Sequence, residues 1–228
     1  MEIDNDNSEV ALTQLVLDEL LRGVNDGDYQ PGDRIVASRL CEQLGLSLAP
    51  VREALHVLAG QGVVMLLRNR GAVLRAISRQ DVIDFWPVIS APASLSIRLA
   101  TINIDRDDNA DRVRAEMQKV IENTHKATSL NFFIAAKEYH WLLNEIADNP
   151  FIETLFSRYF LAYWERFVGD ALPMHKYADE YIHNYQRMTE SILVGDSPSA
   201  TSIWSYHVEW SMAILRGDEV EPGKPWIR

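Results

Sequence analysis

The sequence is poor in the features that indicate an exported or membrane protein. It contains one cysteine, Cys41, so no disulfide can form within a chain. It has no uninterrupted apolar run of about 18 residues, the length that a transmembrane helix needs. Its first residues, MEIDNDNSEV, are acidic and polar, unlike the basic start and apolar core of a secretory signal. These absences predict a cytoplasmic protein without a membrane partner.

Positive charge is also scarce, because the net charge of the chain is −11. Such an acidic balance argues, for the chain as a whole, against a nucleic-acid partner. Residues 34–79, however, carry seven arginines, no lysine and only two acidic residues. A basic segment inside an acidic chain indicates one phosphate-binding face. The alternative is a chance fluctuation of surface charge.

Apolar periodicity in the N-terminal third predicts three helices followed by a β-hairpin. The expected elements are helices over 10–26, 35–45 and 47–60 and strands over 63–67 and 72–77. Ser47 is a suitable N-cap for the third helix, and the asparagine and glycine of residues 68–71 suit a hairpin turn. The order predicts a winged helix-turn-helix domain over residues 9–78, after a disordered tail of residues 1–8. A generic small α+β domain is the alternative.

Beyond residue 79 the β pattern disappears and apolar stripes at helical spacing replace it. Helices are expected over 80–102, 107–127, 129–147, 150–168, 176–194 and 198–215. Helices of this length with short connections predict an antiparallel bundle over residues 79–216, followed by an extended tail, 217–228. Pro87 and Pro92 fall inside the first of these helices and are expected to kink or interrupt it. The fold class is therefore mainly α, with a winged helix-turn-helix domain before a helical bundle.

The segment from Pro31 to Ser78 resembles the DNA-binding domain of GntR-type bacterial transcription regulators. The resemblance rests on Pro31-Gly32, on the run PVREAL at 50–55 and on the wing sequence NRGAV at 69–73. The helical remainder is similar to the FCD-like effector domain of the FadR subfamily. Its weaker matches are Tyr139-His140, Asn149-Pro150, Gly195-Asp196 and His207. Together the resemblance covers about residues 10–216.

The resemblance implies a transcription regulator, not an enzyme, that acts as a homodimer on a short palindromic operator in double-stranded DNA and responds to a small organic effector. The third helix would lie in the major groove, with its N-terminal residues nearest the bases. The residues implied in DNA binding are Arg39, Ser47, Leu48, Ala49, Arg52, Arg70 and Gly71. Arg52 would bond a guanine or a phosphate; its alternative role is a surface salt bridge with Glu42 or Glu53.

Leu48 departs from the family pattern, which usually has arginine after the N-capping serine. Leucine can touch a thymine methyl group but cannot read guanine. We therefore expect an operator that differs from the common family type, or an affinity that depends more on Arg39, Arg52 and the wing.

Members of this subfamily often bind a divalent metal in the bundle through an aspartate, a histidine four residues later and two further histidines. The corresponding positions here are Ala136, His140, Tyr185 and His207. Helical spacing points the three polar side chains toward the interior, where we expect them to converge. Two histidines without a carboxylate make a poor divalent site, so no metal cofactor is predicted. The three residues would bind an organic effector instead, or would be hydrogen-bonded core residues.

Ile89 and Ala93 stand where the family commonly carries an arginine and a glutamate. An arginine at Ile89 would suit the carboxylate of an anionic ligand. Its replacement predicts a more apolar or aromatic effector, or none.

Two other functions stay open from the sequence. The first is a regulator whose effector domain only dimerises. The second, more remote, is a metalloenzyme built on the helical bundle. Its only support is Glu180-x-x-His183, one copy of a spacing that di-iron bundles use twice.

Overall fold

The computed structural model describes residues 3–68, 71–126, 129–155, 161–164, 167–168, 172 and 174–221. The contacts between residues divide the chain into two compact units. The first contains Met1–Ile77 and Ser157–Trp164, and the second contains Ser78–Phe156 and Glu165–Arg228. The boundary at Ile77 lies next to the expected one, whereas the return of Ser157–Trp164 to the first unit was not expected. Within that unit the Tyr163 hydroxyl donates a hydrogen bond to the carbonyl oxygen of Arg75.

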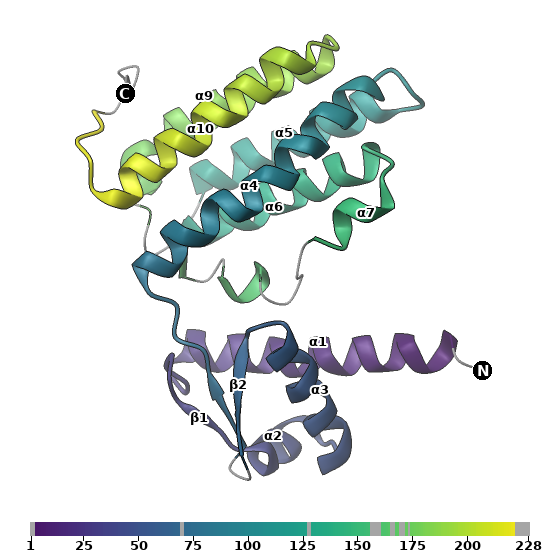
Figure 1. Cartoon of the computed structure of the whole chain (residues 1–228), viewed down its shortest axis with the longest axis vertical. Coiled ribbons are helices and arrows are strands. Elements are labelled where there is room, and N and C mark those ends of the chain that lie inside the picture. The colour runs from purple at the N-terminus through teal and green to yellow at the C-terminus, as the bar shows by residue number, and fades with distance from the viewer. Residues whose placement is uncertain are drawn as a thin grey trace. The chain divides into compact units, whose positions relative to one another are not determined.

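Three helices form the bulk of the N-terminal unit (Figure 1). They are α1 (Ile3–Asp26), α2 (Ala37–Leu44) and α3 (Leu48–Gly60). Both α1 and α2 pack against α3. The buried side chains that hold them together are Val16, Leu17, Leu20, Leu40, Val51, Leu55 and Leu58. Because Gly45 adopts a left-handed conformation, it ends α2 and lets α3 begin three residues later, which is the helix-turn-helix arrangement.

A small antiparallel sheet completes this unit, with the strand order β1-β3-β2. The hairpin strands are β2 (Val64–Leu67) and β3 (Gly71–Leu74), and β1 is Arg34–Ile35. Ile35 pairs with Ala72 and is fully buried. The expected helix over 35–45 was therefore wrong at its start, because the sheet rather than the helix takes Ile35.

The C-terminal unit is a bundle of long helices (Figure 1). Its elements are α4 (Arg79–Ile102), α5 (Asn109–Lys126), α6 (Ser129–Ile146), α7 (Pro150–Glu153), α9 (Met174–Leu193) and α10 (Ser197–Arg216). Helix α4 packs against α6, α9 and α10, and α5 packs against α6 and α9. The Arg79 guanidinium donates hydrogen bonds to the carbonyl oxygens of Leu215 and Ile214, which fixes the start of α4 to the end of α10.

Helix α4 is continuous through Pro87 and Pro92, so the prolines do not interrupt it. A proline has no backbone N–H to donate to the carbonyl group four residues earlier. Pro87 and Pro92 therefore leave the carbonyl groups of Ile83 and Val88 without their helical hydrogen bond. Val88 is largely exposed, so water can hydrate its carbonyl group at the helix surface. In the described part of the chain, α4 is also the one helix whose length and composition would allow it to cross a membrane. It packs against three neighbouring helices of its own unit, which accounts for the apolar residues on that side but leaves Val88 and Ile102 exposed.

Two further expectations about helix ends were wrong. Helix α1 begins at Ile3, so residues 3–8 are helical and not a disordered tail. The predicted helix over 150–168 is interrupted, because α7 stops at Glu153 and a turn follows, whereas residues 161–164 and 167–168 are helical as expected; residues 156–160, 165 and 166 lie outside the described residues. At the other end, Gly217 adopts a left-handed conformation that stops α10, and residues 218–221 form no regular element.

Candidate nucleic-acid interface and effector site

A groove of about 980 Å³ lies in the N-terminal unit between α3, the start of α2 and the hairpin. It is lined by Arg34, Val36, Ala37, Ser38, Leu48, Arg52, Leu55, His56, Leu66, Leu67, Arg68 and Gly71. Three of these side chains are arginines, and none of the described lining residues is acidic. The groove is therefore a concave, positively charged surface beside the helix that would read DNA.

Arg52 is exposed in this groove because of its position on α3. Val51, Ala54, Leu55 and Leu58 are buried on the core side of that helix, which leaves Arg52 on the outer side. Within the described residues Arg52 forms no ion pair, so the alternative role in a salt bridge with Glu42 or Glu53 is not seen. Its guanidinium group is free to bond an incoming phosphate or base edge.

The start of α3 presents its first residues outward. Ser47 is the N-cap of α3, as expected, and has an extended conformation, but its side chain makes no capping hydrogen bond. Its hydroxyl group is thus not committed to the helix, and both Leu48 and Ala49 are exposed beside it. Backbone donors at a helix start attract phosphate groups, so this turn suits the DNA backbone.

Of the three remaining predicted DNA-binding residues, one lines the groove, one does not, and one lies outside the described residues. The Arg39 guanidinium carbon lies 5.5 Å from the ring centre of the buried Tyr29, in a cation–π contact, and Arg39 does not line the groove. Gly71 does line the groove, and its φ of +85° is a conformation that favours glycine. A Cβ atom there would come within 2.8 Å of the Ile35 carbonyl oxygen, so the sheet itself requires glycine. Arg70 lies outside the described residues.

In the C-terminal unit, His140, Tyr185 and His207 converge as helical spacing predicts. His140 Nε2 and the Tyr185 hydroxyl oxygen are 3.1 Å apart and share a hydrogen bond. The ring centres of Tyr185 and His207 are 5.2 Å apart. Trp204 completes the group: its ring centre lies 4.6 Å from that of His140, and it stacks on His207 at 5.4 Å. We call these four residues the aromatic cluster.

Burial keeps both histidines of the aromatic cluster uncharged. It lowers the pKa of His140 to about 4 and the pKa of His207 to about 3, the latter also through repulsion by His140. Part of the His140 residue is exposed to solvent, but its imidazole ring packs against the rings of Tyr139, Tyr185 and Trp204. The Nδ1 atoms of His140 and His207 are both buried without a hydrogen-bond partner within the described residues. Unpaired buried nitrogens are costly, and a bound ligand with polar groups would satisfy them.

The other two predicted effector residues contribute less. Ala136 is buried one turn before His140 on α6, but its methyl side chain offers no metal ligand. Ile89 on α4 is half-buried. Its neighbour Ser90 makes the described contact with the aromatic cluster, because the Trp204 indole N–H donates a hydrogen bond to the Ser90 carbonyl oxygen. The side chains at these positions do not fit a divalent metal, since they include two histidines and no carboxylate. In addition, His140 Nε2 is already hydrogen-bonded to the Tyr185 hydroxyl group. Among the described residues no three His, Cys, Asp or Glu side chains gather to hold a metal ion.

Two family models match the chain and together span both units. The model described as bacterial regulatory proteins, gntR family, matches residues 12–74, and the FCD domain model matches residues 93–209. The chain is a GntR-family regulatory protein with an FCD domain. This agrees with the resemblance to the FadR subfamily. The family and its members are transcriptional regulators and not enzymes, which removes the metalloenzyme suggested by Glu180 and His183.

Curated relatives of this GntR-family protein are transcription regulators too. The chain is 22% identical over 139 residues to YdhC of Bacillus subtilis and 26% identical over 118 residues to McbR of Escherichia coli, both named HTH-type transcriptional regulators. These matches cover 60% and 52% of the chain and only 61% and 51% of the two relatives. A solved structure titled E. coli McbR/YncC is 18% identical with a TM-score of 0.72, over 90% of this chain and 97% of that one, which supports the fold.

Several residues of both sites escaped sequence reasoning. The groove includes His56, Leu66 and Leu67, which stood out neither by charge nor by motif. Arg68 belonged to the arginine-rich segment and could have been named from it. Trp204 lies three residues before His207, so the helical face of His207 already contained the signal for it.

Proposed function

We propose that this GntR-family protein is a transcription regulator of the cytoplasm that binds a short palindromic operator as a homodimer and releases or engages it in response to a small organic effector. The observation that carries the DNA-binding part is the arginine-lined groove beside α3, with Arg52 exposed and outside any described ion pair. Arginine forks bond phosphates and guanine edges, and the helix-turn-helix presents α3 to a major groove.

Two arguments support a homodimer. A single recognition helix buries too little DNA surface for specific binding at physiological salt, whereas two related copies double the contact and read an inverted repeat. In addition, α4 carries apolar surface that one chain does not cover, because Val88 and Ile102 are more than 60% exposed. A second copy of the chain would cover such a face.

The aromatic cluster supports an uncharged, aromatic effector. Its walls are rings, its histidines are neutral at pH 7, and the two unpaired Nδ1 atoms can each donate or accept one hydrogen bond. To act as a switch, the ligand must bind the DNA-competent and DNA-incompetent states with different affinity. Rings in such close contact are also what a packed core would show. They therefore support the second candidate function too, a bundle that only dimerises. A thermal-shift screen of aromatic metabolites separates the two, since only a ligand-binding bundle gains stability.

The proposed operator binding is tested by selecting duplexes from a random-sequence DNA pool with the full chain. We expect the enriched duplexes to contain an inverted repeat, and light scattering of the complex to give two chains per duplex. Unselective recovery of the pool, or one chain per duplex at micromolar concentration, would contradict the proposal.

We further propose that the protein holds no resident metal, and a double substitution tests this. Ala136→Asp with Tyr185→His restores the family's ligand set, so nickel or zinc should raise the melting temperature of this variant and leave that of the wild type unchanged. Ala136→Asp alone is the intermediate case, because it adds the carboxylate but keeps the Tyr185 hydroxyl on His140 Nε2, so metal should raise its melting temperature less. One tightly held ion per wild-type chain in metal analysis would overturn the proposal, and a folded double variant that binds none would refute the assignment of these positions.

A further inference from the structure

The groove beside α3 has an apolar wall as well as its arginines. Leu48, Leu66 and Leu67 line it and are 42%, 43% and 39% exposed. We call these three residues the leucine wall. Leu48 begins α3, and the other two end β2, so separate elements bring them to one groove.

Core packing does not account for the leucine wall. Alternate residues of a strand face the same side, so Leu66 shares a side with the buried Val64. Yet Leu66 stays exposed, as do Met65 and Leu67, and the end of β2 therefore lies beyond the core. Leu48 occupies the first turn of α3, where the helix faces outward. Exposed leucines on a surface that also carries three arginines indicate a partner that is both anionic and locally apolar.

Duplex DNA fits that description at one base. The major groove presents donors and acceptors at every base pair, but its one ordinary apolar group is the C5 methyl of thymine. We propose that Leu48 is a specificity-determining residue that selects a thymine methyl in each operator half-site. This inference rests on the proposed DNA binding. The arginines of the groove supply the attraction to the phosphates, and the leucine wall excludes water around the methyl group.

Leucine at this position also disfavours the other bases. Against guanine it would cover the O6 and N7 acceptors without offering a donor, against cytosine the N4 donor, and against adenine the N7 acceptor and the N6 donor. Desolvated polar groups without a partner weaken binding. The operator should therefore contain a T·A pair at the position that the first turn of α3 faces.

The test removes the methyl group from the DNA and the leucine from the protein. Each thymine of a duplex selected from a random pool is replaced in turn by uracil, which lacks only the C5 methyl. For the wild type we expect one position in each half-site at which uracil weakens binding about three- to tenfold, the effect of losing one to two buried methyl contacts. Leu48→Ala should weaken binding to the thymine duplex by a similar factor and lose the sensitivity to uracil.

Control variants separate reading by Leu48 from general damage. Met65→Ala removes an exposed apolar side chain of β2 that does not line the groove, so it should keep the uracil sensitivity. Leu48→Met should keep most of it, because methionine retains an apolar contact. Circular dichroism shows whether each variant folds, and exposed Leu48 makes folding of its variants expected.

The failures are distinguishable. If the wild type binds its selected duplex and no uracil substitution matters, or if Leu48→Ala keeps the full uracil sensitivity, thymine reading by Leu48 is overturned while DNA binding stands. If the wild type binds no duplex selectively, the proposed function fails and the inference fails with it.

Discussion

Arg52→Ala is expected to weaken binding to a selected duplex by about tenfold to a hundredfold, which corresponds to about 1–3 kcal/mol for a lost bidentate contact. Arg52 lies in the groove on the outer side of α3, and the described residues hold it in no ion pair. Its removal therefore costs DNA contacts and no contact within the protein. Fluorescence anisotropy with a labelled duplex measures the change.

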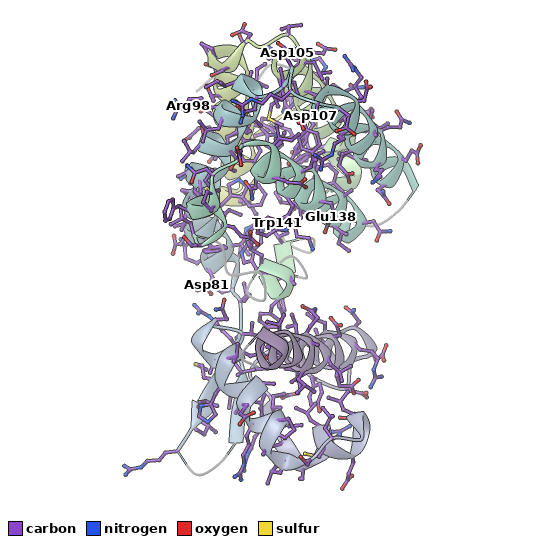
Figure 2. All side chains as sticks on the ribbon, turned by 90° about the vertical axis from the view of Figure 1, so that its right-hand side faces the viewer. Asp81, Arg98, Asp105, Asp107, Glu138 and Trp141 are labelled. Atoms are coloured by element: carbon purple, nitrogen blue, oxygen red, sulfur yellow. The ribbon has the colours of Figure 1, made fainter. Side chains whose placement is uncertain are left out.

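Two further variants show what Arg52 contacts. Arg187→Ala removes the same charge from an exposed position on α9 in the other unit, whose side chains are drawn in Figure 2, and it should leave the affinity unchanged. Arg52→Lys keeps the charge but loses the planar fork, so it preserves a phosphate contact better than a contact to guanine. If Arg52→Ala binds the selected duplex like the wild type, the placement of α3 against DNA is wrong.

Acid should destabilise the C-terminal unit through the aromatic cluster. The pKa values of His140 and His207, about 4 and about 3, lie below the ordinary value of 6.5. Between pH 6.5 and 4 these two histidines are therefore protonated in the unfolded chain but not in the folded chain. The free energy of unfolding is thus retained above pH 6.5 and decreases as the pH falls below it. The slope is about 1.4 kcal/mol per pH unit for each histidine, which gives a loss of about 4 kcal/mol at pH 5 for the pair.

Urea unfolding followed by tryptophan fluorescence at pH 7 and pH 5 measures this loss. His207→Asn removes one of the two buried imidazoles and should reduce the difference between the two pH values by about half, whatever it does to stability at pH 7. His183→Asn, at an exposed position on α9, should leave the difference unchanged. Equal differences in the wild type and in His207→Asn would show that His207 is not held neutral in the folded chain.

Local patterns made most of the fold predictable. The apolar spacing around Val51, Leu55 and Leu58 placed α3, and the turn residues 68–71 placed the hairpin. Residues whose position depends on distant partners were missed. Ile35 extends the apolar pattern of α2, but pairing with Ala72 draws it into the sheet.

The candidate sites were predictable to the same extent. Helical faces brought His140, Tyr185 and His207 together, because each lies on the apolar side of its own helix. The contact of Arg39 with Tyr29 was not predictable, because nothing in the local sequence reveals the ring beneath its guanidinium group. The groove is lined by residues of α3 and of the end of β2, which are separate in the sequence. The exposure of Leu66 and Leu67 depends on where the core ends, which the local pattern does not reveal.

The central claim is that the arginine-lined groove beside α3 binds duplex DNA, and a salt titration of that binding tests it most directly. The affinity of the full chain for a selected duplex is measured by fluorescence anisotropy at several salt concentrations. The account predicts selective binding whose logarithmic affinity falls linearly with the logarithm of the salt concentration, with a slope of several units, since each neutralised phosphate contributes about 0.9. Binding that does not distinguish the selected duplex from a scrambled one, or that does not change with salt, would contradict the claim.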